Sequence, residues 1–137
     1  MLALRLIAWA LTAAYWVIIF VITHLPPSGL PRVRVSDKGA HFIGYGLLSA
    51  GLFVSLSLTG LAARRCAIVV LLIAMGYGAF DEWSQRFVRR TSELDDWLAD
   101  VGGALVAVGV MWLGRAIVAR LHAGAEPEPG IADAPEL

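Results

Sequence analysis

The sequence predicts an all-α protein, a bundle of four transmembrane helices, from its composition and from the lengths of its apolar runs. Of its 137 residues, 58% are hydrophobic and only 16% are charged, whereas a soluble domain carries about 25% charged residues. Four apolar stretches each approach the roughly 20 residues that a helix needs to cross the hydrocarbon core. A helix satisfies its own backbone hydrogen bonds in lipid, so four spanning helices are the expected form.

The first expected span is Leu6 to Ile22, interrupted only by Thr12, and it extends back to Leu2 with only Arg5 interrupting that extension. A cleaved signal peptide is the alternative interpretation. Its apolar region would be only about 7–15 residues long and would end at a small-x-small cleavage site. This run is longer and ends in His24-Leu25-Pro26-Pro27, which favours a membrane anchor.

The second expected span covers residues of about 38–61 and follows a loop rich in proline and glycine at 26–31. Proline lacks a backbone donor and glycine loosens the chain, so the first helix ends before this loop. Ser36 is placed to act as an N-cap, and Asp37 in the first turn suits the positive end of the helix dipole.

The third expected span runs from about Cys66 to Val88, after a short connection at Arg64-Arg65. A charged turn follows, and the fourth span covers about 96–118. Within the turn, Ser92 with Asp95 three residues later resembles a capping box.

We expect one membrane domain over residues 1–123 and a disordered acidic tail over 124–137. The tail holds four acids, three prolines and few large apolar side chains, too little apolar surface to order it. The single cysteine, Cys66, excludes an intrachain disulfide framework or a cysteine-based zinc cluster. The net charge of zero leaves no basic surface for nucleic acid.

Polar residues of three spans recur on one helical face and at one end of the bundle, because residues three or four apart share a face. Facing lipid, such side chains would each cost roughly 1–3 kcal/mol, so they should turn inward to form a polar pocket open to that membrane surface. The three stripes are Asp37, His41, Tyr45 and Leu48; Tyr77, Asp81 and Gln85; and Asp96, Asp100, Gly103 and Ala107.

Small residues predict where the helices approach closely. They are Ala99, Gly103 and Ala107 in the fourth span and Gly44, Gly46, Gly76 and Gly78 in the second and third. Trp83 and Trp97 lie near the same membrane surface as the polar stripes, where indole side chains act as interfacial anchors.

Three motifs in order carry a resemblance to a known family. They are Asp37-Lys38-x-x-His41-Phe42-x-x-Tyr45-x-x-Leu48, then Asp81-Glu82-x-x-Gln85-x-Phe87, then Arg90 followed by Asp96-Trp97-x-Ala99-Asp100-x-x-Gly103. Over residues 37–104 this pattern resembles the VanZ-like family. The resemblance implies a small polytopic protein of the bacterial cell envelope, and the founding member is associated with teicoplanin resistance. The family often has Pro-Gly before the loop arginine. Here Arg89 stands there and the loop is one residue shorter, so either Arg89 or Arg90 fills that role.

The polar residues give one candidate site with two sets of roles. The residues expected to be catalytic or to bind ligand are His41, Asp81 and Glu82. The further ligand-binding residues are Asp37, Lys38, Tyr45, Gln85, Arg90, Asp96 and Asp100.

The preferred function is an outward-facing pocket that binds a lipid headgroup, a lipid-linked cell-wall precursor or a glycopeptide. One alternative is a membrane-embedded hydrolase or transferase with His41 or Glu82 as the base, and Lys38 and Arg90 holding a phosphate or carboxylate. Another is a proton-coupled or structural subunit of a larger membrane complex. The acids would then only form ion pairs with Lys38, Arg86 or Arg90.

No cofactor or metal ion is predicted, because no recognised ligand spacing occurs. The weaker metal interpretation combines His41 with the acids Asp37, Asp81, Glu82 and Asp100. Ser84 and Ser92 lack a G-x-S-x-G setting, so a serine nucleophile is unsupported. His24, assigned to the proline-rich loop, and His122, just after the last span, have no partner motif.

The expected location is a bacterial inner or plasma membrane, with the chain crossing several times. Lys and Arg number five on the side of the termini and six on the side of the polar stripes, so the positive-inside rule does not decide the orientation by count. The bases near the stripes have acidic neighbours, whereas those near the termini are largely free. This difference favours cytoplasmic termini and a pocket that faces outward.

Overall fold

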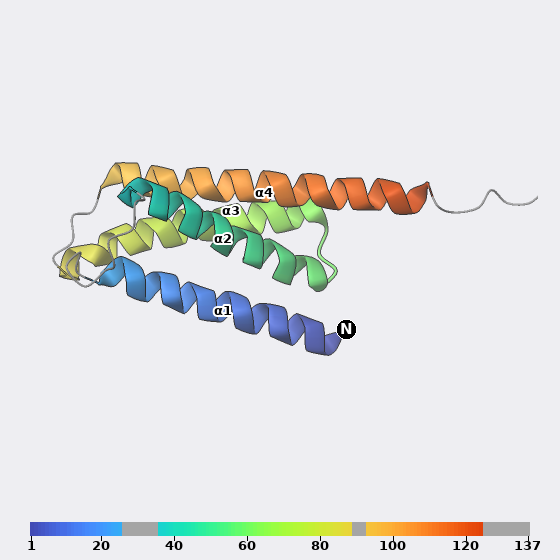
Figure 1. Ribbon diagram of the computed structural model, residues 1–137, viewed down its shortest axis with the longest axis horizontal. Coiled ribbons are helices and arrows are strands. Elements are labelled where there is room, and N and C mark those ends of the chain that lie inside the picture. Colours follow the sequence, from blue (N-terminus) through green and yellow to red (C-terminus); the bar gives the residue numbers. More distant parts are fainter. Residues whose placement is uncertain (26–35, 89–92, 125–137) are drawn as a thin grey trace, which may run out of the picture.

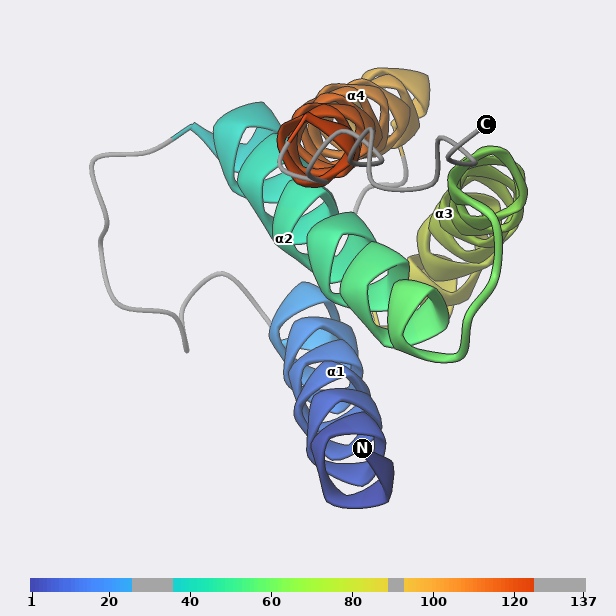
Figure 2. The same ribbon diagram turned by 90° about the vertical axis from the view of Figure 1, so that its right-hand side faces the viewer.

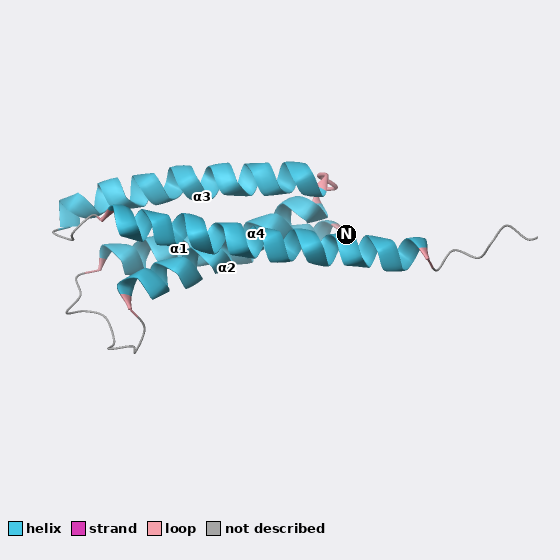
Figure 3. Ribbon diagram, turned by 90° about the horizontal axis from the view of Figure 1, so that it is seen from above, coloured by secondary structure: helices cyan, strands magenta, loops and turns pink. Residues whose placement is uncertain are grey.

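The computed structural model describes residues 1–25, 36–88 and 93–124, and these residues form four long helices without a strand (Figures 1 and 3). The helices are α1 (Leu2–His24), α2 (Asp37–Leu58), α3 (Ala63–Gln85) and α4 (Leu94–Ala123), with a short 3₁₀ helix, η2 (Arg86–Val88), after α3. All four are long and apolar enough to cross a membrane. The predicted all-α, four-span fold is confirmed.

The helices alternate in direction, so the N-terminus, the end of α4 and the α2–α3 connection lie at one end of the bundle (Figure 1). The ends at His24, Asp37, Gln85 and Leu94 lie together at the other; we call this the motif end. Viewed along the bundle, α2 lies between α1 and the pair of α3 and α4 (Figure 2). The apolar core accordingly centres on α2, through Leu48, Leu52 and Phe53, with Val70 of α3 and Val108 of α4.

Ser36 caps α2 as predicted, since its Oγ accepts a hydrogen bond of 3.1 Å from the Gly39 N–H. The helix ends at Leu58, a turn earlier than expected, because Gly60 turns the chain with a φ of 89°. Glycine adopts that conformation without the clash a Cβ would introduce. Arg64 and Arg65 therefore lie in the first turn of α3 rather than in the connection.

The start of α4 also differs from the expectation. Its N-cap is Glu93, which makes no side-chain capping bond, and Ser92 of the expected capping box lies outside the described residues. The helix continues to Ala123, five residues beyond the predicted end of the span, and the proposed tail lies beyond the described residues except for Gly124.

The closest helix contact joins α2 and α4 at two glycines. A Cβ added at Gly103 would collide with the Phe42 backbone, and one added at Gly46 would lie 3.3 Å from the Gly103 carbonyl oxygen. Gly78 is likewise close to Trp97 and Asp100. Of the predicted small-residue contacts, Gly76 is wrong, because nothing in the described chain lies within 4 Å of its added Cβ.

Arg115 of α4 fastens the opposite end of the bundle. Its guanidinium donates to the Ser57 hydroxyl and to the Leu61 carbonyl oxygen, both at 3.0 Å. Since Ser57 lies in the last turn of α2 and Leu61 lies in the connection to α3, this side chain holds three helices together away from the motif end.

Candidate functional site

Most of the predicted site residues are buried together at the motif end. Asp37 and Lys38 are exposed, Tyr77 is partly buried, and Arg90 lies outside the described residues. The buried side chains that carry ionisable or amide groups are defined here as the polar cluster: His41, Asp81, Glu82, Gln85, Asp96 and Asp100.

His41 joins α2 to the other two helices of the polar cluster. Its Nδ1 lies 2.9 Å from Asp100 Oδ1 of α4 and 4.0 Å from Glu82 Oε1 of α3. The convergence predicted from helical spacing therefore occurs, and the His41 ring lies between carboxylates of two different helices.

Glu82 is held by both of its carboxylate oxygens. Oε2 accepts the backbone N–H of Glu93 at 3.0 Å, and Oε1 lies 3.4 Å from the Gln85 amide nitrogen. That nitrogen also donates to Asp81 Oδ2 at 3.2 Å. The end of α3 is thus attached to the start of α4, with one Glu82 oxygen turned toward His41.

Helix α1 contributes two residues that the sequence interpretation missed. His24 was assigned to the proline-rich loop without a partner, which is wrong: it is the last residue of α1. The Thr23 hydroxyl donates to Asp81 Oδ1 at 3.0 Å, and His24 Nδ1 lies 3.7 Å from the same oxygen. The sequence did contain a signal for these two residues, because Thr23 and His24 end the apolar run at the depth of the polar stripes. Pro26 and Pro27 led to a predicted helix end that was too early.

Ser84 is the third missed residue. Its hydroxyl lies 2.9 Å from His24 Nε2 and also 2.9 Å from the Asp81 carbonyl oxygen. His24 Nδ1 is 2.8 Å from the Phe20 carbonyl oxygen, which can only accept, so Nδ1 carries a proton. Helices α1 and α3 are therefore bridged by a histidine and a serine beside the polar cluster.

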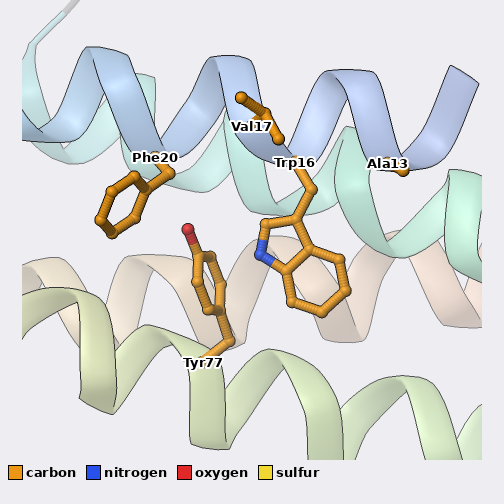
Figure 4. Close-up of a pocket in the computed structure, with 5 residues that line it drawn as sticks. All are labelled: Ala13, Trp16, Val17, Phe20 and Tyr77. Atoms are coloured by element: carbon orange, nitrogen blue, oxygen red, sulfur yellow. The ribbon is translucent and has the colours of Figure 1, made fainter.

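Aromatic rings form the floor of the site, toward the membrane interior. The Tyr45 ring stacks between His41 and Tyr77, with centroid separations of 6.4 and 5.7 Å. One turn below Asp81, Tyr77 borders an apolar groove of about 350 Å³ between α1 and α3. Figure 4 shows the Tyr77 hydroxyl directed toward α1 between the rings of Phe20 and Trp16. Tyr77 thus contacts both Tyr45, beside the polar cluster, and the apolar groove.

The charges of the polar cluster are unevenly balanced. Its four acids, Asp81, Glu82, Asp96 and Asp100, are all buried. Within residues 1–25, 36–88 and 93–124, the ion-pair contacts of these acids involve only His24 and His41. Lys38, one of the bases expected to pair with them, binds the exposed Asp95 instead. The ion-pair interpretation therefore holds for Lys38 and Asp95 but not for Lys38 and a buried acid, whereas Arg90 is outside the described residues.

Trp97 has a role within the bundle that was not predicted. Its Nε1 donates to the Met75 carbonyl oxygen at 3.1 Å, which joins α4 to α3. Trp83, by contrast, is 53% exposed, as an interfacial anchor would be.

Two groups of side chains in the described chain bring metal-binding atoms together. In one, ligand atoms of His41, Glu82 and Asp100 all lie within 4.8 Å of one another, and all three residues are buried. In the other, Asp37 and Asp96 approach His41 in the same way, with Asp37 exposed. His41 is common to both groups, so an imidazole nitrogen and several carboxylate oxygens are available at a single place.

Comparison with known proteins gives one match. The model of the family described as VanZ/LLP1 matches residues 4–115, which cover α2, α3, most of α1 and α4, and the whole polar cluster. No curated protein and no solved structure matches the chain.

Proposed function

The chain belongs to the VanZ/LLP1 family, and we propose that it binds a lipid headgroup or a lipid-linked cell-wall precursor in the envelope of a bacterium. The binding site is the polar cluster at the motif end, in a protein of the inner or plasma membrane. A glycopeptide with the same donor groups is the related candidate ligand.

The observation that carries this proposal is the meeting of polar side chains from all four helices beneath one membrane surface. Thr23 and His24 come from α1, His41 from α2, Asp81 and Glu82 from α3, and Asp96 and Asp100 from α4. Ionisable side chains within spanning helices destabilise insertion by a few kcal/mol each, and those that remain mark binding or transport sites.

Unpartnered atoms indicate the chemistry of the ligand. Among the described residues, Gln85 Oε1, Asp96 Oδ1 and Asp100 Oδ2 are buried and have no hydrogen-bond partner. These three atoms of the polar cluster are acceptors and fit a ligand that presents N–H or O–H groups, such as an ammonium or a sugar hydroxyl. The Tyr45 and Tyr77 hydroxyls are also buried without a partner and can donate to such a ligand. Buried acceptors left without partners are costly, and such a ligand would satisfy them.

The apolar groove between α1 and α3 favours a lipid over a soluble ligand. It begins one turn beneath Asp81 and is lined by Trp16, Phe20 and Tyr77 with two smaller residues of α1. A headgroup in the polar cluster would place the first part of an acyl chain at this groove (Figure 4). A free headgroup would lose that apolar contact.

Two neighbouring aspartates provide the test. Asp96 is 4% exposed and belongs to the polar cluster, whereas Asp95 is exposed. We expect Asp96→Asn to weaken binding about tenfold or more, the loss of one charge-assisted hydrogen bond, and Asp95→Asn to leave it unchanged. Binding is measured by native mass spectrometry of the full chain with phosphatidylethanolamine, phosphatidylglycerol, a lipid-linked wall precursor and teicoplanin. Equal behaviour of the two variants toward every probe would contradict the proposal.

We also place the termini in the cytoplasm and the polar cluster on the outer side. In support, Lys38 is paired with Asp95 at the motif end, whereas Arg64, Arg65 and Arg120 at the other end are exposed and suit the cytoplasmic side. Ser28→Cys should react with a membrane-impermeant maleimide on intact cells, and Gly124→Cys only after permeabilisation. The reverse pattern would refute this orientation.

One observation favours a second candidate, a membrane-embedded hydrolase. With Nδ1–H donated to Phe20, His24 Nε2 can accept the proton of the Ser84 hydroxyl 2.9 Å away, as the base beside a serine nucleophile does. The Asp81 carbonyl oxygen competes for the same proton. A fluorophosphonate probe should then label the wild type and the control Ser49→Ala, but not Ser84→Ala. Absence of labelling in the wild type would exclude this candidate.

A further inference from the structure

His41 is the place in the described chain where a nitrogen ligand meets buried carboxylates. Its Nδ1 lies 2.9 Å from Asp100 Oδ1 and 4.0 Å from Glu82 Oε1. Two ligand atoms about 2.1 Å from a tetrahedral zinc ion lie roughly 3.4 Å apart. The two separations from His41 fall on either side of that value, and the third, between Glu82 and Asp100, is at most 4.8 Å. Side-chain shifts of about 0.5–1.4 Å would therefore complete the geometry.

Buried oxygens without a hydrogen-bond partner lie at the edge of the same group, and the Gln85 oxygen would reach it once its amide turns over, because the amide nitrogen now faces Glu82. The Gln85 amide nitrogen is 3.4 Å from Glu82 Oε1, which places the amide at the edge of the group. Its Oε1 has no hydrogen-bond partner among the described residues, and the side chain is 1% exposed. Asp100 Oδ2 is also unpartnered, in a residue that is 0% exposed. These oxygens can supply a fourth ligand to a cation.

The excess of acids over histidines in the polar cluster also favours binding of a cation. Four buried acids face two histidines in the described part of the chain, and uncompensated charges are strongly disfavoured in a low-dielectric interior. A divalent ion neutralises two carboxylates in a single step, and a set of one imidazole and several carboxylates suits zinc, manganese or iron(II) better than magnesium.

We propose that His41, Glu82 and Asp100 bind a divalent transition-metal ion, with Gln85 Oε1 as an additional oxygen ligand. The ion takes the position of the hydrogen between His41 Nδ1 and Asp100 Oδ1, and the metal-bound imidazole carries its proton on Nε2. Binding of the metal does not depend on binding of a headgroup. The ion would nevertheless offer a phosphate-bearing ligand a coordination position next to the unpartnered oxygens of the polar cluster.

Zinc and cobalt(II) are the probes that test this site. The full chain is purified in lipid nanodiscs, stripped with EDTA and titrated with each ion. We expect one zinc ion to bind per chain. We also expect bound cobalt(II) to absorb visible light, as it does in protein sites of low coordination symmetry. His41→Gln, Glu82→Gln and Asp100→Asn should each weaken binding about tenfold or more. The absence of stoichiometric zinc binding by the wild type would overturn the proposal.

Matched controls separate this site from adventitious binding. His24→Gln removes the other histidine at the motif end, and Asp95→Asn removes an exposed acid, so both should bind zinc like the wild type. If His41→Gln binds as tightly as His24→Gln, the assignment to His41 is wrong. Should a ligand variant fail to fold, the wild type still decides, because zinc should raise its unfolding temperature and EDTA should reverse the rise.

Discussion

Gly103→Ala tests whether the contact between α2 and α4 holds the polar cluster together. The added Cβ would lie 2.9 Å from the Phe42 carbonyl carbon and 3.1 Å from its Cα, and it would collide with the carbonyl oxygen. All three are backbone atoms, so no side-chain rotation relieves the contact. Since carbon atoms pack at about 3.5–4.0 Å, the two helices must separate there by roughly half an ångström or more.

The expected magnitude follows from this displacement. Overpacking a tight contact costs about 1–3 kcal/mol, which at roughly 4 °C per kcal/mol lowers the unfolding temperature by roughly 4–12 °C. The effect should extend to the site, because Phe42 follows His41 and Gly103 lies one turn after Asp100. The same separation would stretch the 2.9 Å contact between His41 and Asp100 beyond the usual hydrogen-bond range.

The assay is thermal unfolding in detergent, followed by size-exclusion chromatography. Gly109→Ala on the same helix is the matched control, because nothing lies within 4 Å of its added Cβ. That change should be neutral or stabilising by up to about 1 kcal/mol, from the higher helix propensity of alanine. If Gly103→Ala unfolds at the temperature of Gly109→Ala, the close helix approach is not what holds this end of the bundle.

Three further outcomes are expected from changes elsewhere in the chain. Arg115→Lys should lower the free energy of unfolding by about 1–3 kcal/mol, since the hydrogen bonds of Arg115 to Ser57 and Leu61 involve a charged donor. The measurement is thermal unfolding beside the exposed control Arg120→Lys. Equal unfolding temperatures of the two variants would contradict this expectation. Lys38→Ala should change stability by less than about 1 kcal/mol, because the side chains of Lys38 and Asp95 are 52% and 62% exposed; a larger loss in the same melt would mean that this pair matters. Cys66, at 0% exposure, should resist maleimide in the folded protein and react in SDS, as judged by mass spectrometry; rapid reaction of the folded chain would show that its burial is wrong.

Helical spacing predicted the four spans and their polar faces, because the length of a span and the direction of its side chains depend on local sequence. The stripe from His41 to Leu48 and the stripe from Asp96 to Gly103 needed only 3.6-residue periodicity and the cost of polar groups in lipid. The meeting of His41 with Asp100 then followed from the antiparallel order of the spans.

Contacts that depend on how two helices cross could not be predicted in the same way. Gly76 and Gly78 are two residues apart and so face different directions, and only Gly78 meets α4. Nothing in the local pattern distinguished them. His24 was missed for a related reason, because its partners Ser84 and Asp81 lie about 60 positions later in the chain and no spacing rule connects α1 with α3.

The length of α4 determines what can be attached to this protein without disturbing its site. Thirty residues at 1.5 Å each make a rod of about 45 Å, against a hydrocarbon core of about 30 Å. Residues 116–122 are all exposed, and this end extends past the turn between α2 and α3 (Figure 1). A fluorescent protein or affinity handle fused after Ala123 would stand roughly 35 Å from Asp100 along the helix axis, at the opposite end of the bundle from the polar cluster.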